Sequence, residues 1–210
     1  MHNHKTLLEI HEDVPANHYD QGIKRNLFQK YWHWRRFAEV LKVTEPTEGP
    51  ILDIGCHSGT FTQVILSKAG TKQIYGIDVS NSAIALAKKR IPYGKFEVGD
   101  AAKLPFKSDF FELVYCLEML EHVDDPVAVL KEARRVLKKG GKMVLLVPSD
   151  NKLFKLIWFV WTMYYHHWRH AHVQSYSKGL LEKVVENVGF KVLKVKTFQS
   201  GMLKLIVCQK

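Results

Sequence analysis

The sequence predicts an α/β protein built as a three-layer sandwich, in which a mostly parallel seven-stranded sheet ends in a C-terminal antiparallel hairpin. Two observations support this fold class. Apolar runs alternate with helical segments through residues 51–147, which is typical of parallel strands joined by crossover helices. The last two apolar runs, 191–197 and 203–208, are separated only by a short turn, which predicts antiparallel pairing. The pattern is typical of a Rossmann-like fold.

Each element follows from its own local signals. Residues 20–43 are expected to form a helix, and a segment rich in Pro and Gly breaks the chain at 45–50. The apolar residues at helical spacing in this first helix are Ile23, Leu27, Tyr31, Trp34, Ala38 and Leu41. Besides the hairpin, strands are expected at 51–54, 73–77, 95–98, 111–115 and 143–147, and helices at 59–68, 81–90, 126–137 and 178–188.

Capping residues set the expected ends of these helices. Ser80 is expected to cap the helix that follows it, and Pro126 stands where a first helical turn tolerates proline. The pair Gly140-Gly141 is expected to close the helix that Pro126 opens, and Gly189 to end the last helix.

The composition places the chain in a broad class. Its 210 residues, 46% hydrophobic and 25% charged, suffice for one domain with a substantial core. Cys56, Cys116 and Cys208 lie far apart and form neither a metal-binding spacing nor a disulfide framework. We therefore expect no metal site and a reducing, cytoplasmic location. The polar N-terminus lacks the apolar core of a secretory signal, so secretion is not expected.

The most informative stretch runs from Leu52 to Thr62. An apolar run stops at Gly55, Gly59 follows, and helix-compatible residues then begin. Because glycine has no side chain, a ligand can approach such a turn closely. The unpaired N–H groups at the start of the next helix also attract polar ligand groups. This turn predicts a site for a nucleotide-type cofactor.

Polar side chains also follow the other predicted strands. Asp53 ends the first strand, Asp78 the second and Asp100 the third, and Cys116-Leu117-Glu118 ends the fourth. Open parallel sheets bind ligands at these carboxyl ends, so we expect the residues to gather there. Asp78 can accept hydrogen bonds from two ribose hydroxyls, and Asp100 from an adenine amino group. Taken singly, Asp53 and Asp78 also fit a purely structural capping role.

Five blocks follow one another between residues 50 and 147: Leu-Asp-Ile-Gly-Cys-His-Ser-Gly (52–59), Gly-Ile-Asp-Val-Ser (76–80), Gly-Asp-Ala-Ala-Lys-Leu-Pro-Phe (99–106), Cys-Leu-Glu-Met-Leu-Glu-His-Val (116–123) and Val-Leu-Lys-Lys-Gly-Gly-Lys (136–142). In this order and spacing they resemble the class I S-adenosylmethionine-dependent methyltransferases. The similarity is closest to the small-molecule, quinone-biosynthesis-like subgroup.

The resemblance implies S-adenosyl-L-methionine as cofactor and S-adenosyl-L-homocysteine as product. The residues that it assigns to the cofactor are Asp53, Gly55, Cys56, Gly59, Asp78, Val79, Asp100, Ala101, Cys116 and Leu117. Asp53 and the backbone at Gly55 would hold the methionine end and Asp78 the ribose. Val79, Asp100 and Ala101 would surround the adenine. Cys116 and Leu117 would line the sulfonium side.

One position departs from the family pattern. The family usually has a third glycine where this chain has His57. Either His57 contacts the bound ligand, or it is a tolerated substitution whose side chain faces solvent. If the position has positive φ, histidine fits it less well than glycine. A nicotinamide dehydrogenase is the rival for the glycine turn alone, but the Gly-x-x-x-Gly spacing and the acidic strand ends disfavour it.

Methyl transfer needs alignment of the acceptor and exclusion of water, and oxygen or nitrogen acceptors also need a base. His122, just past the fourth strand, is the candidate catalytic base. The alternative is a structural role, because the resembling family has this histidine in members with differing substrates. His166 and His170 are further catalytic candidates in the segment after the fifth strand.

That segment, 148–176, is unusually aromatic and basic, and methyltransferases of this type carry a substrate-side insertion there. Trp158, Trp161 and Tyr165 are expected to face the substrate. Residues 153–168 are apolar nearly all round but too short to span a bilayer, so peripheral membrane contact is an alternative. The histidines of the segment have no acid or cysteine near them in sequence, which disfavours a metal site.

The resemblance also divides the chain, a single methyltransferase domain over 1–210. An N-terminal helical cap (1–49) would close over the cofactor-binding core (50–147), with Tyr19, Tyr31 and Arg35 facing the site. The alternative for the cap is a packing helix with exposed arginines. The insertion (148–176) and a C-terminal helix and hairpin (177–210) complete the domain.

The net charge of +10 is concentrated in residues 131–210, which carry 16 bases against 4 acids. This asymmetry fits either attraction of anions or solvated lysines.

The leading prediction is methyl transfer to a small apolar or aromatic acceptor, with lipid-linked acceptors included. The alternatives are a nucleic-acid or protein methyltransferase and a non-enzymatic cofactor-binding or membrane-surface protein. The fourth strand lacks the Asn/Asp-Pro-Pro-Tyr/Phe motif of amino-group methylases, so nucleic acid is not the expected partner.

Overall fold

The computed structural model describes residues 27–149, 151, 153–155, 176 and 179–210. Its centre is a seven-stranded sheet with the strand order β3-β2-β1-β4-β5-β7-β6. The strands are β1 (Ile51–Ile54), β2 (Ile74–Asp78), β3 (Lys95–Val98), β4 (Phe111–Leu117), β5 (Leu137–Pro148), β6 (Lys191–Phe198) and β7 (Leu203–Gln209). The pairs from β3 to β5 are parallel, whereas β7 is antiparallel to both β5 and β6. The predicted sheet and hairpin are therefore confirmed.

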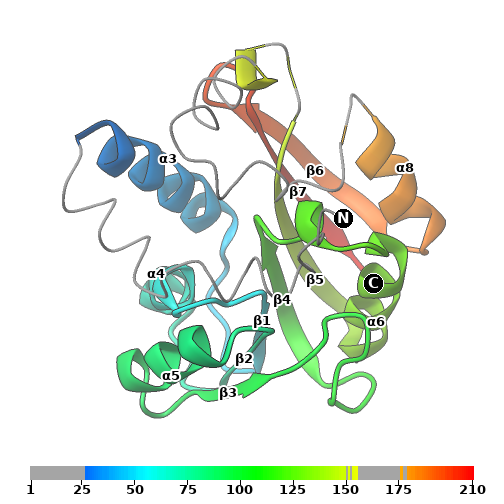
Figure 1. Cartoon of the computed structure of the whole chain (residues 1–210). Coiled ribbons are helices and arrows are strands. Elements are labelled where there is room, and N and C mark those ends of the chain that lie inside the picture. The colour runs from blue at the N-terminus through cyan, green and yellow to red at the C-terminus, as the bar shows by residue number, and fades with distance from the viewer. Residues whose placement is uncertain (1–26, 150, 152, 156–175, 177–178) are drawn as a thin grey trace, which may run out of the picture.

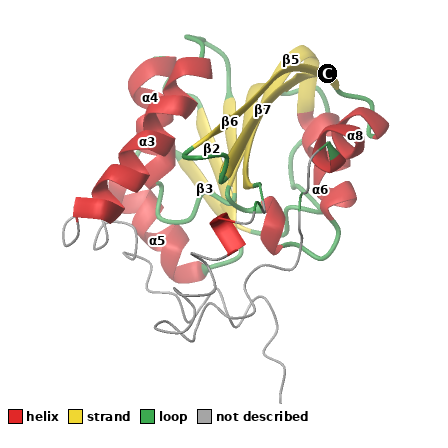
Figure 2. Ribbon diagram, turned by 90° about the horizontal axis from the view of Figure 1, so that it is seen from above, coloured by secondary structure: helices red, strands yellow, loops and turns green. Residues whose placement is uncertain are grey.

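Helices cover both faces of the sheet and complete the three layers. Figure 2 shows α3, α4 and α5 on one side and α6 and α8 on the other. Their bounds are α3 (Leu27–Val43), α4 (Thr60–Ala69), α5 (Asn81–Arg90), α6 (Pro126–Val136) and α8 (Leu180–Asn187), with a short 3-10 turn η1 (Leu120–His122). The carboxyl ends of the parallel strands meet between these layers, at the edge where η1 lies (Figure 1).

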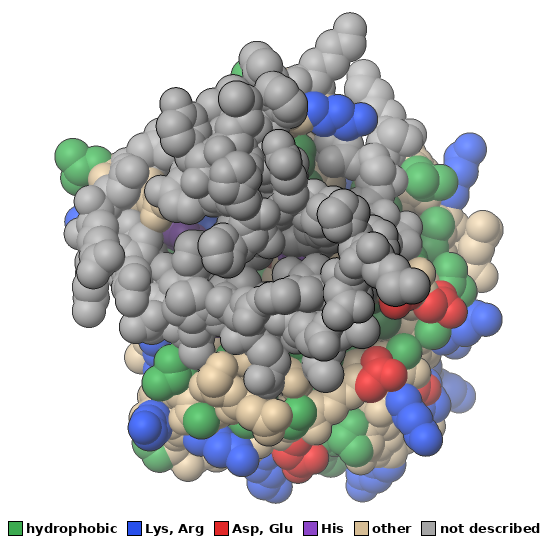
Figure 3. All heavy atoms as spheres, in the orientation of Figure 1, with side chains coloured by type: hydrophobic (Ala, Val, Ile, Leu, Met, Phe, Trp, Pro, Cys, Tyr) green, Lys and Arg blue, Asp and Glu red, His purple; other side chains and the backbone are tan. Residues whose placement is uncertain are grey.

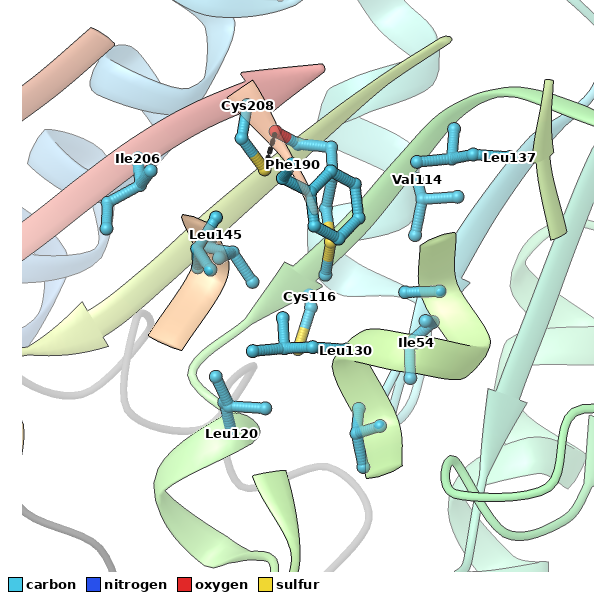
Figure 4. Close-up of a cluster of buried hydrophobic side chains, with 14 of the residues drawn as sticks. Ile54, Val114, Cys116, Leu120, Leu130, Leu137, Leu145, Phe190, Ile206 and Cys208 are labelled. Atoms are coloured by element: carbon cyan, nitrogen blue, oxygen red, sulfur yellow. Dashed lines mark hydrogen bonds between the residues drawn. The ribbon is translucent and has the colours of Figure 1, made fainter. Parts of the chain in front are cut away.

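Two apolar clusters fill the space between sheet and helices. One joins the strands to α6 and α8, and Figure 4 shows its side chains, among them Cys116, Leu120, Leu130, Phe190 and Ile206. The other joins the opposite face to α3, α4 and α5 through residues such as Val40, Ile65 and Ala87. The central strands are buried on both faces, which is why they are apolar throughout rather than alternating.

Within the described residues, the predicted apolar face of the first helix is wrong in its N-terminal part, whereas Ala38 and Leu41 are half-buried. Leu27, Tyr31 and Trp34 are 85%, 58% and 60% exposed. The buried face of α3 instead carries three polar side chains and one valine: His33, Arg36, Glu39 and Val40. Charged partners on the sheet side explain this orientation, because a buried charge that is paired loses much less than one that is not.

The predicted closure of the fourth helix by Gly140-Gly141 is also wrong. The helix α6 ends at Val136, and the chain enters β5 at once, since Leu137 pairs with Phe111. The register then shifts before Lys142 pairs with Leu113. Gly140 has φ 77° within this irregular part of the strand. The glycines therefore serve a bulge in β5, which bends the strand.

Candidate functional site

The glycine turn between β1 and α4 has the backbone that its sequence predicts. Gly55, His57 and Gly59 have φ values of 75°, 45° and 76°. A side chain at Gly55 would place its Cβ 2.5 Å from Cγ of Met119. The N–H of Gly55 donates to the carbonyl of Ile77 at 2.8 Å, which ties the turn to the end of β2. His57 therefore occupies a left-handed position that glycine adopts with less strain.

Asp53 lies beneath this turn and is only 1% exposed. Its Oδ2 accepts a hydrogen bond from the Thr62 hydroxyl at 2.6 Å, so β1 and α4 are joined across the turn. Burial, reinforced by the negative charge of Asp78 and opposed by the Thr62 hydrogen bond, raises the pKa of Asp53 to about 7.

Asp78, at the end of β2, fixes the turn from the other side. Its Oδ2 accepts from the backbone N–H of His57 at 2.8 Å, and its Oδ1 accepts from that of Ser80 at 3.0 Å. The predicted cap is confirmed, because the Ser80 hydroxyl accepts from the N–H of Ala83 at the start of α5. A carboxylate oxygen can accept more than one hydrogen bond, so Asp78 keeps acceptor capacity for a ligand.

Asp100 follows β3, next to the end of β2 that carries Asp78. The N–H of Gly99 donates to the carbonyl of Asp78 at 2.9 Å, which holds the two strand ends together. The carboxylate of Asp100 is exposed and accepts from the N–H of Ala102 at 2.8 Å. Ala101 and Val79 are half-buried nearby in sequence. Three carboxylates thus lie at the carboxyl ends of three adjacent strands.

The end of β4 supplies an apolar wall. Cys116 and Leu117 are buried, and Cys116 pairs in register with Ile54 at the end of β1. Burial, with the charges of Glu121 and Asp53, raises the pKa of the Cys116 thiol, and burial likewise raises that of Cys56 in the turn. Both sulfur atoms therefore stay protonated and behave as small apolar groups.

A polar cluster just beyond Leu117 was missed by the sequence reasoning. The Arg36 guanidinium, on α3, forms an ion pair with the carboxylate of Glu118 and contacts the ring of His33. Glu118 has a positive φ of 54°. The helical spacing of His33 and Arg36 was the available signal, but a search for apolar periodicity passes over polar residues.

His122 lies on η1, close to the end of β4. Its Nε2 is 4.0 Å from Oε1 of the buried Glu121. The Tyr176 hydroxyl donates to the carbonyl of Leu120 at 3.0 Å and so packs against the same turn. This pairing suits either a structural contact or a proton acceptor.

The remaining predicted positions divide into two groups. Tyr31 and Arg35 are described, and Arg35 approaches the buried Glu39 at 4.0 Å rather than Glu118. Tyr19, Trp158, Trp161, Tyr165, His166 and His170 lie outside the described residues. Within the part of the chain that the structure describes, no group of three His, Cys, Asp or Glu side chains could hold a metal ion.

A sheet of this order with acids at three neighbouring strand ends defines a Rossmann-like methyltransferase fold. Residues 23–195 match a family model described as "Methyltransferase domain". The chain belongs to this methyltransferase family.

Curated relatives are similar over the same region. The chain is 35% identical over 153 residues to a ubiquinone/menaquinone biosynthesis C-methyltransferase of Desulfotalea psychrophila, covering 70% of this chain and 61% of the relative. It is 32% identical over 152 residues to a demethylmenaquinone methyltransferase of Bacillus velezensis, covering 69% and 64%. The matched region thus spans less than two thirds of the length of either relative.

Solved structures share the fold at lower identity. A putative methyltransferase in complex with the Trm112 methyltransferase activator, from Haloferax volcanii, has a TM-score of 0.75 at 17% identity and covers 91% of this chain and 96% of its own. A putative methyltransferase of Bacillus halodurans has a TM-score of 0.66 at 22% identity, covering 78% and 72%.

Proposed function

We propose that the protein transfers the methyl group of S-adenosyl-L-methionine to a small aromatic acceptor of the quinone type. The observation that carries the proposal is the arrangement of Asp53, Asp78 and Asp100 at three adjacent strand ends around the glycine turn. Carboxylates are pure hydrogen-bond acceptors, and the cofactor offers them an ammonium, two ribose hydroxyls and an adenine amino group. This set of acceptors therefore fits the hydrogen-bond donors of the cofactor.

Different residues of the chain would bind different parts of the cofactor. Asp78, already oriented by the N–H groups of His57 and Ser80, would accept from the ribose hydroxyls. Val79, Asp100 and Ala101 would surround the adenine. Asp53, together with the turn that contains Gly55, Cys56 and Gly59, would hold the methionine end. When bound, the cofactor supplies a methyl carbon on a positively charged sulfur. Cys116 and Leu117 would exclude water beside it.

The acceptor assignment rests on two relatives, one named a ubiquinone/menaquinone biosynthesis C-methyltransferase and the other a demethylmenaquinone methyltransferase. Such acceptors carry ring oxygens and a lipid chain, and the ring is aromatic in the reduced quinol form. The substrate-side segment 148–176, with Trp158, Trp161 and Tyr165, would enclose them. His122 would take the proton that the acceptor loses, with the adjacent Glu121 stabilising the imidazolium.

Calorimetry with the purified protein tests the cofactor assignment. We expect S-adenosyl-L-homocysteine to bind with a dissociation constant well below about 1 mM. Asp78→Ala should weaken binding at least about tenfold, because it removes hydrogen bonds to a charged group. Asp109→Asn serves as the control, because the carboxylate of Asp109 pairs with Lys210 at an exposed site. A protein that binds neither S-adenosyl-L-methionine nor its product in this range would refute the proposal.

Nucleic-acid methylation is less well supported than a small acceptor. Six basic side chains of residues 131–210 form ion pairs with acids of the chain: Arg135, Lys138, Lys142, Lys196, Lys204 and Lys210. In the face that Figure 3 shows, the visible Lys and Arg side chains are scattered around the rim, and a few acids lie among those at the lower right. Salt-dependent binding of RNA or DNA near 0.15 M salt would favour this alternative.

Peripheral membrane contact would use the segment 153–168, of which only residues 153–155 are described. Leu153 is exposed, and the N–H of Phe154 is capped by the side chain of Asn151 at 2.7 Å. Among the described residues no helix has the length and apolarity that crossing a bilayer requires. Co-sedimentation with anionic lipid vesicles tests the contact, and the absence of sedimentation would exclude it.

A further inference from the structure

Arg36 is a buried guanidinium beside the proposed methyl-transfer site. Its side chain is 7% exposed, and that of its ion-pair partner Glu118 is 11% exposed. The two residues are 82 positions apart in sequence and join α3 to the end of β4. A buried pair of this kind is a weak source of stability, since desolvation offsets much of the attraction. Stability alone therefore does not explain why the Arg36–Glu118 pair is buried here.

The Arg36–Glu118 pair lies beside the glycine turn, and this position indicates a functional role. Glu118 directly follows Leu117 in the wall at the end of β4, and the next residue, Met119, fills the space beside Gly55. The guanidinium carbon of Arg36 lies 5.9 Å from the ring centre of Phe61, in the first turn of α4. Arg36 thus contacts α4, which follows the glycine turn, and the end of β4, which packs beside that turn.

The guanidinium also has a donor left over. One terminal nitrogen bonds Glu118 and the other contacts His33, whereas the buried Nε has no hydrogen-bond partner among the residues that the structure describes. The guanidinium has no acceptor atom, so this N–H can only donate. Leaving such a group unpaired in a buried place is costly, and a ligand oxygen would remove the cost.

We propose that Arg36 binds an oxygen atom of the methyl acceptor and that Glu118 positions the guanidinium for this contact. The inference rests on the proposed function and adds the group that selects oxygen-bearing aromatic acceptors. A cation at the ring oxygen stabilises the anionic form of a quinol. That form is the more electron-rich methyl acceptor, so Arg36 acts on both binding and reactivity.

The test compares two probes that differ only in the ring oxygens: 2-prenyl-1,4-naphthoquinol and 2-prenylnaphthalene. Binding is measured by fluorescence quenching, with and without S-adenosyl-L-homocysteine. Arg36→Gln should weaken the quinol about tenfold or more and the hydrocarbon less than about twofold. Arg36→Lys keeps the charge but loses the planar fork and should fall between. Glu118→Gln should also show an oxygen-selective loss.

Arg135→Gln is the matched control, because Arg135 is an ion-paired arginine that also donates to the carbonyls of Leu104 and Phe106. It should lower stability without changing the ratio of the two affinities. Equal weakening of both probes by Arg36→Gln and Arg36→Lys, or no weakening of either, would overturn the inference. Failure of the wild type to bind S-adenosyl-L-homocysteine would instead count against the proposed function.

Discussion

Helix α3 is attached to the sheet in a different way from α6 and α8, the helices of the opposite layer. The layer of α6 and α8 is held by apolar side chains that are almost fully buried: Val129, Leu130, Ala133, Val136, Leu181 and Val185. On the other side, the most buried side chains of α3 are polar except for Val40, and two of them form ion pairs with the sheet side. Arg36 bonds Glu118 of the β4 end, and Glu39 bonds Lys196 of β6. Helices α4 and α5 of the same layer are held by apolar side chains such as Ile65 and Ala87.

The difference separates stability from orientation. Apolar burial is non-directional and contributes most of the folding free energy. An ion pair depends on direction, because the guanidinium and carboxylate must meet in a fixed geometry. The α6 and α8 layer should therefore determine how stable the protein is. The α3 layer should determine how the residues beside the glycine turn are oriented.

Among the variants that test this difference, Leu130→Ala in α6 is expected to change the free energy of unfolding most. Leu130 is fully buried, so its truncation should lower the free energy of unfolding by about 2–5 kcal/mol, measured by urea denaturation. Leu180→Ala, at an exposed position of α8, is the control and should cost less than about 0.5 kcal/mol. A small effect of Leu130→Ala would show that apolar packing is not what holds this layer.

A second prediction concerns Asp53, which lies between the two layers. Its pKa in the folded state is raised to about 7 from an ordinary value of 3.8, chiefly by burial. The folded protein then holds a proton that the unfolded chain has lost, so stability falls as pH rises from about 4 to 7. Relative to wild type, Asp53→Asn should gain a few kcal/mol of stability over this range. Parallel stability curves for the two proteins would contradict the prediction.

Glu39 shows the opposite behaviour, although it is also buried. Burial acts to raise the pKa of Glu39, but the hydrogen bonds and charges of Lys196 and Lys42 outweigh it, and the pKa is lowered. This stabilisation is present above the ordinary pKa of 4.5 and is lost as pH falls through the lowered value. Glu39→Gln should cost about 1–3 kcal/mol at pH 7.

The difference between Glu39→Gln and wild type should shrink toward pH 3 in urea denaturation. Glu45→Gln is the matched control, since Glu45 pairs with Lys142 at an exposed site and should contribute at most about 1 kcal/mol. A loss for Glu39→Gln that stays constant with pH would mean that packing, not charge, attaches α3.

The smallest effect is expected from His57→Gly. The left-handed φ of 45° favours glycine, but glycine also gains freedom in the unfolded chain. We expect a net gain in unfolding free energy below about 1 kcal/mol. The backbone N–H that bonds Asp78 is kept, so affinity for S-adenosyl-L-homocysteine should hold. A large loss of affinity would show instead that the imidazole contacts the cofactor.

The sequence was informative where local chemistry determines structure. The strands and the Ser80 cap follow from apolar runs and from a hydroxyl at the right position, and both are confirmed. It failed at the end of α6, because a Gly-Gly pair that ends a helix looks like one that makes a strand bulge. It also failed at α3, because the partners of Arg36 and Glu39 lie far away in sequence. Apolar periodicity alone then selected exposed residues in the N-terminal part of the helix.

The three buried cysteines can report how often their surroundings open. Cys56 belongs to the cluster under α3, α4 and α5, whereas Cys116 and Cys208 belong to the cluster under α6 and α8. Burial raises the pKa of all three thiols, so an alkylating reagent should modify each one only when its surroundings open. The rate at which each thiol is labelled, measured by mass spectrometry, would report separately on the local opening of each helical layer.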